Sequence, residues 1–305
     1  MKPYYSVNDY YRRLFGEKVY KISLNAGMTC PNRDGSLGSR GCIFCSEGGS
    51  GDFASDLNKD ILAQIDEGIE KVRKKYNGNK FIAYFQAFTN TYAPVKKLDE
   101  IFCAAINDCR IAGISIATRP DCLEDEKISL LSRLNGIKPV FVELGLQTIN
   151  EASARYIRRG YTLPVFEDAL KRLNAAGIRV VVHIIIGLPN ETHEDYMKCA
   201  KYLSGLNING VKIQLLHVLE NTDLKKDYDN GLFKTMTLEE YAKTVVDIIE
   251  VLPPGMVIHR ISGDGPKKIL TAPLWSADKK RVLNTIHSEF AVRNTYQGKE
   301  YCHGT

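Results

Sequence analysis

The sequence of 305 residues has little that would connect it to a membrane or an export pathway. It contains no run of about 18 apolar residues, the length that a membrane-spanning helix needs. Its first residues, MKPYYSVNDYYRRLF, include no apolar stretch of the kind found in signal peptides. Internal repeats and low-complexity segments are also missing. We therefore expect a globular protein of the cytoplasm with no membrane association.

Cysteine is too sparse and too scattered for a disulfide scaffold. The eight cysteines are spread over a chain far longer than the small secreted domains that disulfides stabilise. In a reducing compartment, clustered cysteines more often bind a metal or take part in catalysis. Three of the eight lie close together in the sequence: Cys30, Cys42 and Cys45. We expect the other five to be small apolar fillers.

Charge of one sign is also limited, since the formal net charge is only +5. Its distribution is uneven, because the region from Arg260 to the end has eight Lys and Arg residues against four Asp and Glu residues. Two interpretations of this region are open: a solvated, lysine-bearing surface helix, or a patch that meets phosphate groups. The same region has further residues suited to a nucleic acid, namely Trp275, Phe290, Arg293 and Tyr296.

Short β-rich segments alternate with segments of helical periodicity. The expected strands are 19–25, 80–88, 113–121, 138–148, 179–189 and 210–219. The expected helices are 56–76, 95–108, 124–136, 163–177, 192–206 and 237–252. Six β-α units are fewer than the eight of a closed TIM barrel. They predict an α/β fold, a partial (β/α)6 TIM-like barrel with parallel strands. We assign 1–252 to this core with its N-terminal lead-in, and 253–305 to a small C-terminal extension that either contacts the substrate, such as tRNA, or only caps the open barrel.

Ligands of parallel α/β folds bind at the carboxyl ends of the strands, which directs attention to the loop after the first strand. This loop contains CPNRDGSLGSRGCIFC and has the spacing C-x11-C-x2-C. The two-residue spacer lets Cys42 and Cys45 reach one face of a metal centre. The long spacer before them is rich in Gly, Asn, Asp and Ser, so it bends easily and can bring Cys30 back.

Three neighbouring cysteines, rather than four, favour a metal centre with an open position. A structural zinc site is closed by four ligands, and the next cysteine along the chain is Cys103. Three thiolates on a [4Fe–4S] cubane leave one iron open to the amino and carboxylate groups of S-adenosylmethionine (SAM). A zinc site completed by a distant residue, and a set of unrelated cysteines, are the alternatives.

The cysteine loop, its place after the first strand and the β-α repeats resemble the radical SAM superfamily. The long first spacing is similar to that in the radical SAM domain of the Elongator catalytic subunit. Further segments resemble that domain in order and kind over residues 15–252: TRPD (118–121), ELGLQT (143–148), RRGYT (158–162), HIIIGLPNET (183–192) and VKIQLLHVLENTDL (211–224). Nearly the whole chain is similar to the YhcC/YtqA-type group of short bacterial proteins in its CPNRDG…GCIFC loop, FQAFTNTYAP segment and TAPLWS…VLNTI tail.

This resemblance implies a [4Fe–4S] cluster on the three cysteines, SAM, and a reducing partner such as flavodoxin or ferredoxin. The reduced cluster would cleave SAM to methionine and a 5′-deoxyadenosyl radical, which takes a hydrogen atom from the substrate. For the MnmL-like branch of the group, the implied substrate is tRNA, whose wobble carboxymethylaminomethyl-uridine becomes aminomethyl-uridine. The alternatives are a radical SAM enzyme acting on a small metabolite or a protein side chain, and a non-enzymatic iron–sulfur or zinc-binding protein.

Polar residues near the strand ends are the candidates for SAM binding. Glu143 and Gln147 share one face of a strand, where buried polar groups need a partner. By resemblance, the segment 86–91 replaces the glycine-rich motif that usually contacts the SAM amino group, and Arg159 holds the SAM carboxylate. A satisfied turn, a buried polar network, a surface arginine and a core histidine are the structural alternatives. The full set of expected cofactor-binding residues is Gln86, Thr89, Glu143, Gln147, Arg159, His183 and Gln214.

Overall fold

The computed structural model describes residues 2–49, 58–74, 76, 78–263 and 265–302. Within these residues, the centre is a seven-stranded sheet in which all neighbouring strands are parallel. The strand order follows the chain, β1-β2-β3-β4-β5-β6-β8. The strands are β1 (Tyr20–Leu24), β2 (Phe81–Phe85), β3 (Ile111–Thr118), β4 (Val140–Gln147), β5 (Arg179–Ile186), β6 (Gly210–Leu215) and β8 (Val257–Arg260). A separate antiparallel pair is formed by β7 (Val218–Leu219) and β9 (Leu270–Ala272).

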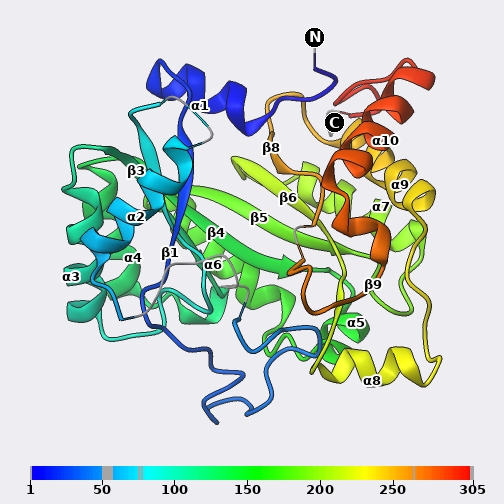
Figure 1. Ribbon diagram of the computed structural model, residues 1–305, viewed down its shortest axis with the longest axis horizontal. Helices are drawn as coiled ribbons and strands as arrows, with labels where there is room; N and C mark the ends of the chain where they lie inside the picture. Colours follow the sequence, from blue (N-terminus) through cyan, green and yellow to red (C-terminus); the bar gives the residue numbers. More distant parts are fainter. Residues whose placement is uncertain (1, 50–57, 75, 77, 264, 303–305) are drawn as a thin grey trace.

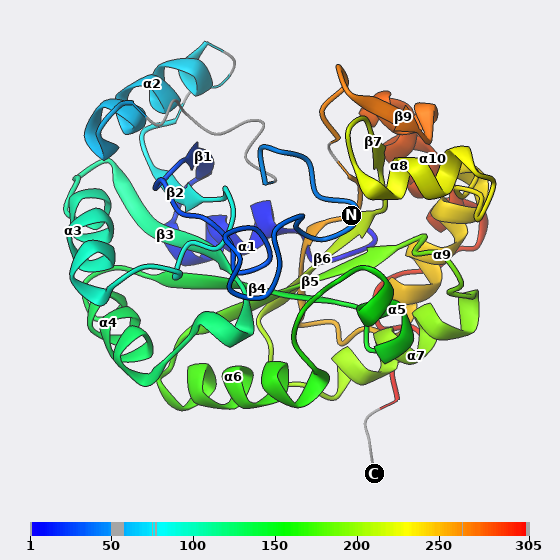
Figure 2. The same cartoon turned by 90° about the horizontal axis from the view of Figure 1, so that it is seen from below.

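Helices cover the outer face of the curved sheet. In Figure 2 they form an arc that runs from α2 to α9 and does not close. The strands at the two edges of the sheet are β1 and β8. The arc consists of α2 (Ile61–Arg73), α3 (Val95–Ile106), α4 (Asp125–Asn135), α6 (Leu163–Ala175), α7 (His193–Ser204) and α9 (Leu238–Val251). This open arc confirms the expected partial TIM-like barrel. No helix in the described ranges is long and apolar enough to cross a membrane.

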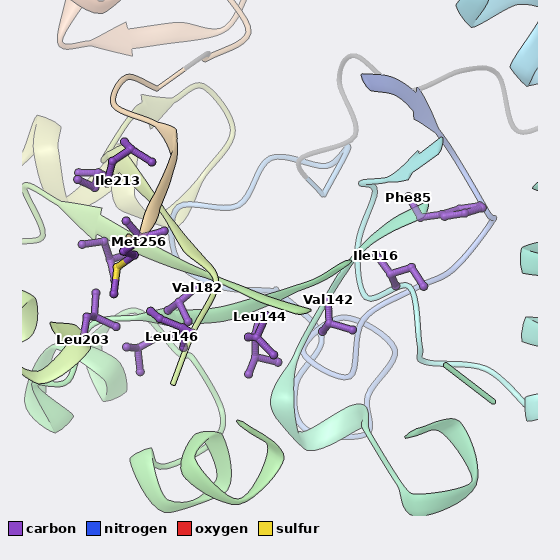
Figure 3. Close-up of a cluster of buried hydrophobic side chains, with 14 of the residues drawn as sticks. Phe85, Ile116, Val142, Leu144, Leu146, Val182, Leu203, Ile213 and Met256 are labelled. Carbon is purple, nitrogen blue, oxygen red and sulfur yellow. The ribbon is translucent and has the colours of Figure 1, made fainter. Parts of the chain in front are cut away.

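Alternation along β4 separates the apolar core from the inside of the barrel. Val142, Leu144 and Leu146 are fully buried, and Figure 3 shows them pointing to the same side of the strand. Because side chains alternate along a strand, Glu143 and Gln147 lie on the opposite, inner face. The same apolar cluster continues across the sheet through Phe85, Ile116, Val182 and Ile213. The outer face therefore supplies the core, and the inner face is available for chemistry.

All six expected strands and all six expected helices are present, with ends that differ by a few residues. Residues 56, 57 and 75 of the first expected helix lie outside the described part of the chain. The sequence patterns did not predict β8, which joins the sheet beside β6. They also did not predict α1 (Val7–Phe15), α5 (Glu151–Tyr156) or α8 (Asp223–Asp229). The basic C-terminal region contains α10 (Lys279–Val292), whose first turn is exposed, as the surface-helix interpretation expected.

Candidate active site inside the open barrel

A cavity of about 200 Å³ opens on the inner face of the sheet, towards the carboxyl ends of the strands. The fold brings all ten residues that we expected to bind a metal or SAM into its wall. These are Cys30, Cys42, Cys45, Gln86, Thr89, Glu143, Gln147, Arg159, His183 and Gln214. They come from the loop after β1 and from strands β2, β4, β5 and β6 or the segments that follow them.

The cysteine loop is held by its own backbone and by one arginine. In Figure 1 this loop, in blue, lies below the sheet beside α5 and α8. The backbone N–H of Arg33 donates to the Cys30 carbonyl at 2.8 Å, and that of Cys45 donates to the Cys42 carbonyl at 3.0 Å. The Arg33 guanidinium reaches across and donates to the Cys45 carbonyl at 2.9 Å. Gly41 makes room for it, because a Cβ there would lie 2.9 Å from Arg33 Nε. The loop thus fixes the first cysteine relative to the third.

The three thiol groups line one cavity but do not converge on one point. Among the described residues, no three His, Cys, Asp or Glu side chains are placed to hold a single metal ion. In a cubane each cysteine binds a different iron, so thiolates spread around a cavity suit a cluster better than one zinc ion. Burial raises the pKa of the Cys42 thiol to about 12, and the neighbouring Cys45 adds to the shift. Such a thiol needs a cationic metal centre beside it to ionise at neutral pH.

Glu143 occupies the middle of the inner face and accepts hydrogen bonds from four other strands. Its Oε1 accepts from Lys21 Nζ at 2.5 Å and from Ser115 Oγ at 2.6 Å. Its Oε2 lies 2.9 Å from His183 Nε2 and also accepts from Lys212 Nζ. A fully buried carboxylate is tolerated only with partners of this kind. Glu143 and His183 therefore belong to one buried polar network, with which SAM would compete for hydrogen bonds.

Two lysines share this carboxylate but have opposite pKa shifts. Burial alone would lower the pKa of Lys21, yet attraction to Glu143 raises it. Burial lowers the pKa of Lys212 to about 7, because repulsion from Lys21 and Arg260 works against the attraction of the carboxylate. Burial, followed by repulsion from Lys212, lowers the pKa of His183 to about 4, so this imidazole is neutral at pH 7. The pKa of one amine in the network is thus lowered towards neutral pH, whereas that of the other is raised.

The backbone conformation and the side-chain amide of Gln147 are suited to binding a polar ligand. It ends β4 with φ at +66°, a left-handed conformation that is uncommon for a residue with a side chain, and the pairing with β5 shifts register here. Its Oε1 is buried and has no hydrogen-bond partner in the part of the chain that the structure describes. A Cβ at Gly145 would lie 3.0 Å from Gln147 Nε2, so a larger residue at this position would push the amide out of its present position. A buried, unpaired amide oxygen in the cavity wall fits a ligand that donates hydrogen bonds, such as SAM.

Arg159 is fully buried and is bonded to the protein through its whole guanidinium group. It is therefore not a surface arginine. The acceptors lie at 2.7–3.1 Å and are the carbonyl groups of Leu146, Thr148 and Tyr161 and the carboxylate of Glu151. These bonds fix the turn between β4 and α5, which carries Gln147 into the cavity. A bond from Arg159 to the SAM carboxylate would have to replace or share one of them.

The remaining candidates keep polar atoms near the cavity. Gln86 Oε1 accepts from Ser23 Oγ at 3.1 Å, and Gln214 Nε2 lies 3.4 Å from His183 Nδ1. Thr89 is buried, and its backbone N–H donates to the Thr29 carbonyl at 3.2 Å. This last bond connects the segment after β2 with the residue that precedes Cys30 in the cysteine loop. The two segments therefore hold each other in position.

The sequence interpretation missed Lys21, Tyr84 and Lys212. Lys212 Nζ lies 3.1 Å from the Tyr84 hydroxyl, and both lysine Nζ atoms lie within 4.7 Å of the centre of that ring. A signal was present, because each lysine lies between two apolar residues of its strand. A charge within a buried strand requires a partner, and that partner is Glu143.

Comparison with known protein families shows to which family the chain belongs. The model of the Radical SAM superfamily matches residues 35–203, and that of the Radical_SAM C-terminal domain matches residues 208–291. The chain belongs to the radical SAM superfamily. The superfamily match includes Cys42, Cys45 and strands β2 to β5, and Cys30 precedes it.

Two relatives and one solved structure show which members of the superfamily this chain is similar to. YtqA of Bacillus subtilis (strain 168) is 43% identical over 98% of this chain and 92% of its own length. The tRNA uridine(34) acetyltransferase of Methanocaldococcus jannaschii is 27% identical over 53% of this chain and 30% of its own length. The structure of Elp3 from Methanocaldococcus infernus has a TM-score of 0.70 at 19% identity, and shows the same fold. It matches 92% of this chain, which spans 64% of that Elp3 chain.

This radical SAM enzyme uses a [4Fe–4S] cluster and SAM, the cofactors of its superfamily. The residues present fit both groups, because three thiols line one cavity and the amide oxygen of Gln147, in the same cavity wall, has no partner among the described residues. When bound, the cluster supplies the electron for the reductive cleavage of SAM. We predict that Cys30, Cys42 and Cys45 hold the cluster and that Gln147 contacts SAM. The protein side of the chemistry is then to position these groups and to exclude water.

Proposed function

We propose that this enzyme acts on tRNA and converts carboxymethylaminomethyl-uridine at the wobble position to aminomethyl-uridine. The observation that carries the proposal is an open groove of about 1630 Å³ with a strongly basic wall. Among the described residues that line it, six are cationic (Arg260, Lys267, Lys268, Lys279, Lys280 and Arg281) and one, Asp278, is acidic. Cations at this density attract a phosphate backbone.

The groove adjoins the cofactor cavity, because Gln86 and Arg260 line both hollows. A tRNA bound along the groove can keep its phosphates against the lysines while one unpaired nucleotide enters the cavity. The amino-acid chemistry of the wall thus matches a polyanion better than a small neutral metabolite.

The aromatic residues expected to stack on bases need correction. Phe290 is 2% exposed and packs in the core, so the expectation was wrong for it. Trp275 does line the groove, but its indole N–H donates to the Met236 carbonyl at 3.0 Å, which fixes the ring. Arg293 is paired with Glu289 at 2.6 Å and is not a free phosphate contact. The proposal therefore rests on the lysines of the groove.

One of the comparisons supports a tRNA substrate. A relative that matches 53% of this chain is named for its action on uridine 34 of tRNA, the wobble position. In the proposal, residues 253–305 form a C-terminal extension that supplies most of the groove wall, and a flavodoxin or ferredoxin supplies the electron.

The test is nucleoside mass spectrometry on tRNA from a strain that lacks the gene. We expect carboxymethylaminomethyl-uridine to accumulate and aminomethyl-uridine and its derivatives to disappear. The wild-type gene should restore them, and the Cys30→Ala variant should not. Unchanged wobble nucleosides in the deletion strain would rule out this substrate.

A further inference from the structure

One amine of the buried network faces the cofactor cavity. Lys212 is 5% exposed and forms part of the cavity wall, together with Tyr84 and Glu143. Lys21 donates to the same carboxylate but is not among the described residues that line the cavity. The two lysines therefore differ in access to a ligand, although they share a partner.

The surroundings of Lys212 favour the neutral amine that nucleophilic attack requires. Its pKa is lowered to about 7, mainly by burial, which favours the unprotonated amine more than at an exposed lysine. The titratable and charged groups around it come from five other strands: Lys21, Tyr84, Glu143, His183, His259 and Arg260. Placing a buried lysine next to other cations is an established way to activate it for attack on carbonyl groups.

We propose that Lys212 is a nucleophile that forms an imine with a short aldehyde acid in the cavity, of which glyoxylate is the simplest. The neutral Nζ adds to the aldehyde carbon, and the resulting carbinolamine loses one water to give Lys–N=CH–COO⁻. The Tyr84 hydroxyl, 3.1 Å from Nζ, and Glu143 are in place to pass the protons that leave nitrogen and reach oxygen. Arg260 pairs in register with Lys212 across β6 and β8 and lines the same cavity, so it places a cation near the acid's carboxylate.

The proposed reactivity of Lys212 adds a step to the proposed tRNA reaction, and its role in the cell rests on that proposed function. The oxidation of tRNA–NH–CH2–COO⁻ to the imine tRNA–N=CH–COO⁻ releases two electrons. The reductive cleavage of SAM to methionine and 5′-deoxyadenosine takes up these two electrons, and one proton is released overall. The Lys212 amine then exchanges with this imine, which frees tRNA–NH2 and leaves the two-carbon acid on Nζ. Water hydrolyses the second imine to glyoxylate and regenerates the amine. No further oxidant is required.

The test uses the reconstituted holoenzyme without tRNA. Glyoxylate is added with sodium cyanoborohydride, which reduces an imine to a stable carboxymethyl-lysine, and the modified residue is located by peptide mass spectrometry. We expect Lys212 to be labelled at pH 7 at least tenfold faster than the exposed Lys96 and Lys97, with a rate that rises through pH about 7. Lys212→Arg keeps the charge but removes the amine, so labelling of this position should be lost. Lys171→Arg, at an exposed position on α6, is the matched control and should leave it in place.

Two outcomes would overturn the inference: labelling of Lys212 no faster than that of exposed lysines, or labelling that begins only at alkaline pH. The wild-type pH profile needs no variant, so a folding defect in Lys212→Arg does not obscure the result. Failure of the proposed function looks different, because trapping at Lys212 would persist while the tRNA of the deletion strain stayed unchanged. Conversely, a tRNA change together with full activity of Lys212→Arg would remove the inference alone.

Discussion

Asn32 donates a side-chain N–H to the Sγ of Cys42 at 3.3 Å. The same Nδ2 atom donates to the Arg158 carbonyl at 2.6 Å, and Asn32 is buried, so the direction of the amide is fixed. A donor aimed at a cluster ligand stabilises the extra negative charge that the sulfur carries in the reduced state. We therefore expect Asn32 to tune the cluster without binding iron.

Asn32→Leu should lower the midpoint potential of the cluster by on the order of 50 mV, since one hydrogen bond to a charged sulfur is lost. The iron content should stay the same. A redox titration followed by electron paramagnetic resonance measures the potential, and Asn284→Leu, at an exposed position on α10, is the control. An unchanged potential in a variant with full iron content would show that the N–H···S contact has no such role.

Gln147→Ala should weaken SAM binding by about tenfold, because one hydrogen bond to the ligand is removed. The cluster and the melting temperature should be little changed, since Oε1 has no protein partner in the described chain. Anaerobic equilibrium dialysis with SAM measures the affinity. Gln297→Ala is an instructive control, because Gln297 bonds to the carbonyl groups of Pro253 and Met256. That variant should lose stability and keep its SAM affinity, and the reverse pattern would contradict our assignment of Gln147.

Arg159→Ala should behave differently from Gln147→Ala. Removing this guanidinium leaves several buried acceptors unpaired, so we expect a loss of about 2–4 kcal/mol in the free energy of unfolding. The yield of 5′-deoxyadenosine should fall as well, because the turn that carries Gln147 loosens. Thermal unfolding and product analysis are measured on the same sample, with the exposed Arg155→Ala as control. Wild-type stability combined with weak SAM binding would instead favour direct contact of Arg159 with the SAM carboxylate.

Replacing Lys279, Lys280 and Arg281 by Glu should weaken tRNA binding and flatten its dependence on salt. Each lost phosphate contact reduces the slope of log affinity against log salt by roughly 0.7–0.9. SAM cleavage without tRNA should not change, because these residues do not line the cofactor cavity. A control variant with Glu at the exposed Lys96, Lys97 and Lys171, on the outer helices, keeps the same net charge. Equal affinities and slopes for the two variants would exclude the groove as the tRNA site.

Local patterns were sufficient to predict the repeating part of the fold. The six expected strands are apolar runs with clear ends, and Gly136 and Gly177 mark the ends of two of the expected helices. The sequence pattern did not predict β8, because its segment, Val257–Arg260, is only four residues long and half of it is polar. Its place in the sheet is decided by pairing with β6 and not by its own pattern. The cysteine triad was predictable because all three residues lie in one loop.

The buried network could not be derived from local patterns. Lys21 and Glu143 are 122 residues apart, and Glu143 and Lys212 are 69 residues apart. Only the closure of the sheet into a curved layer brings these three side chains together. The same holds for Arg159, whose role depends on carbonyl groups that the turn after β4 presents to it. The sequence patterns predicted that polar side chains occupy the inner face of the sheet. They did not predict which of these side chains form hydrogen bonds with one another.

The proposed chemistry depends most directly on a cluster held by Cys30, Cys42 and Cys45. The decisive measurement is the iron content of the anaerobically reconstituted protein, with its Mössbauer spectrum, for the wild type and the triple Ala variant. A variant with Ala at the exposed Cys109 and Cys302 controls for loss of cysteines in general. We predict about four iron atoms per chain with the spectrum of one [4Fe–4S] cluster in the wild type and in the control, and none in the triple variant. A triple variant that retains its cluster, or a wild type that binds zinc and no cluster, would contradict the account.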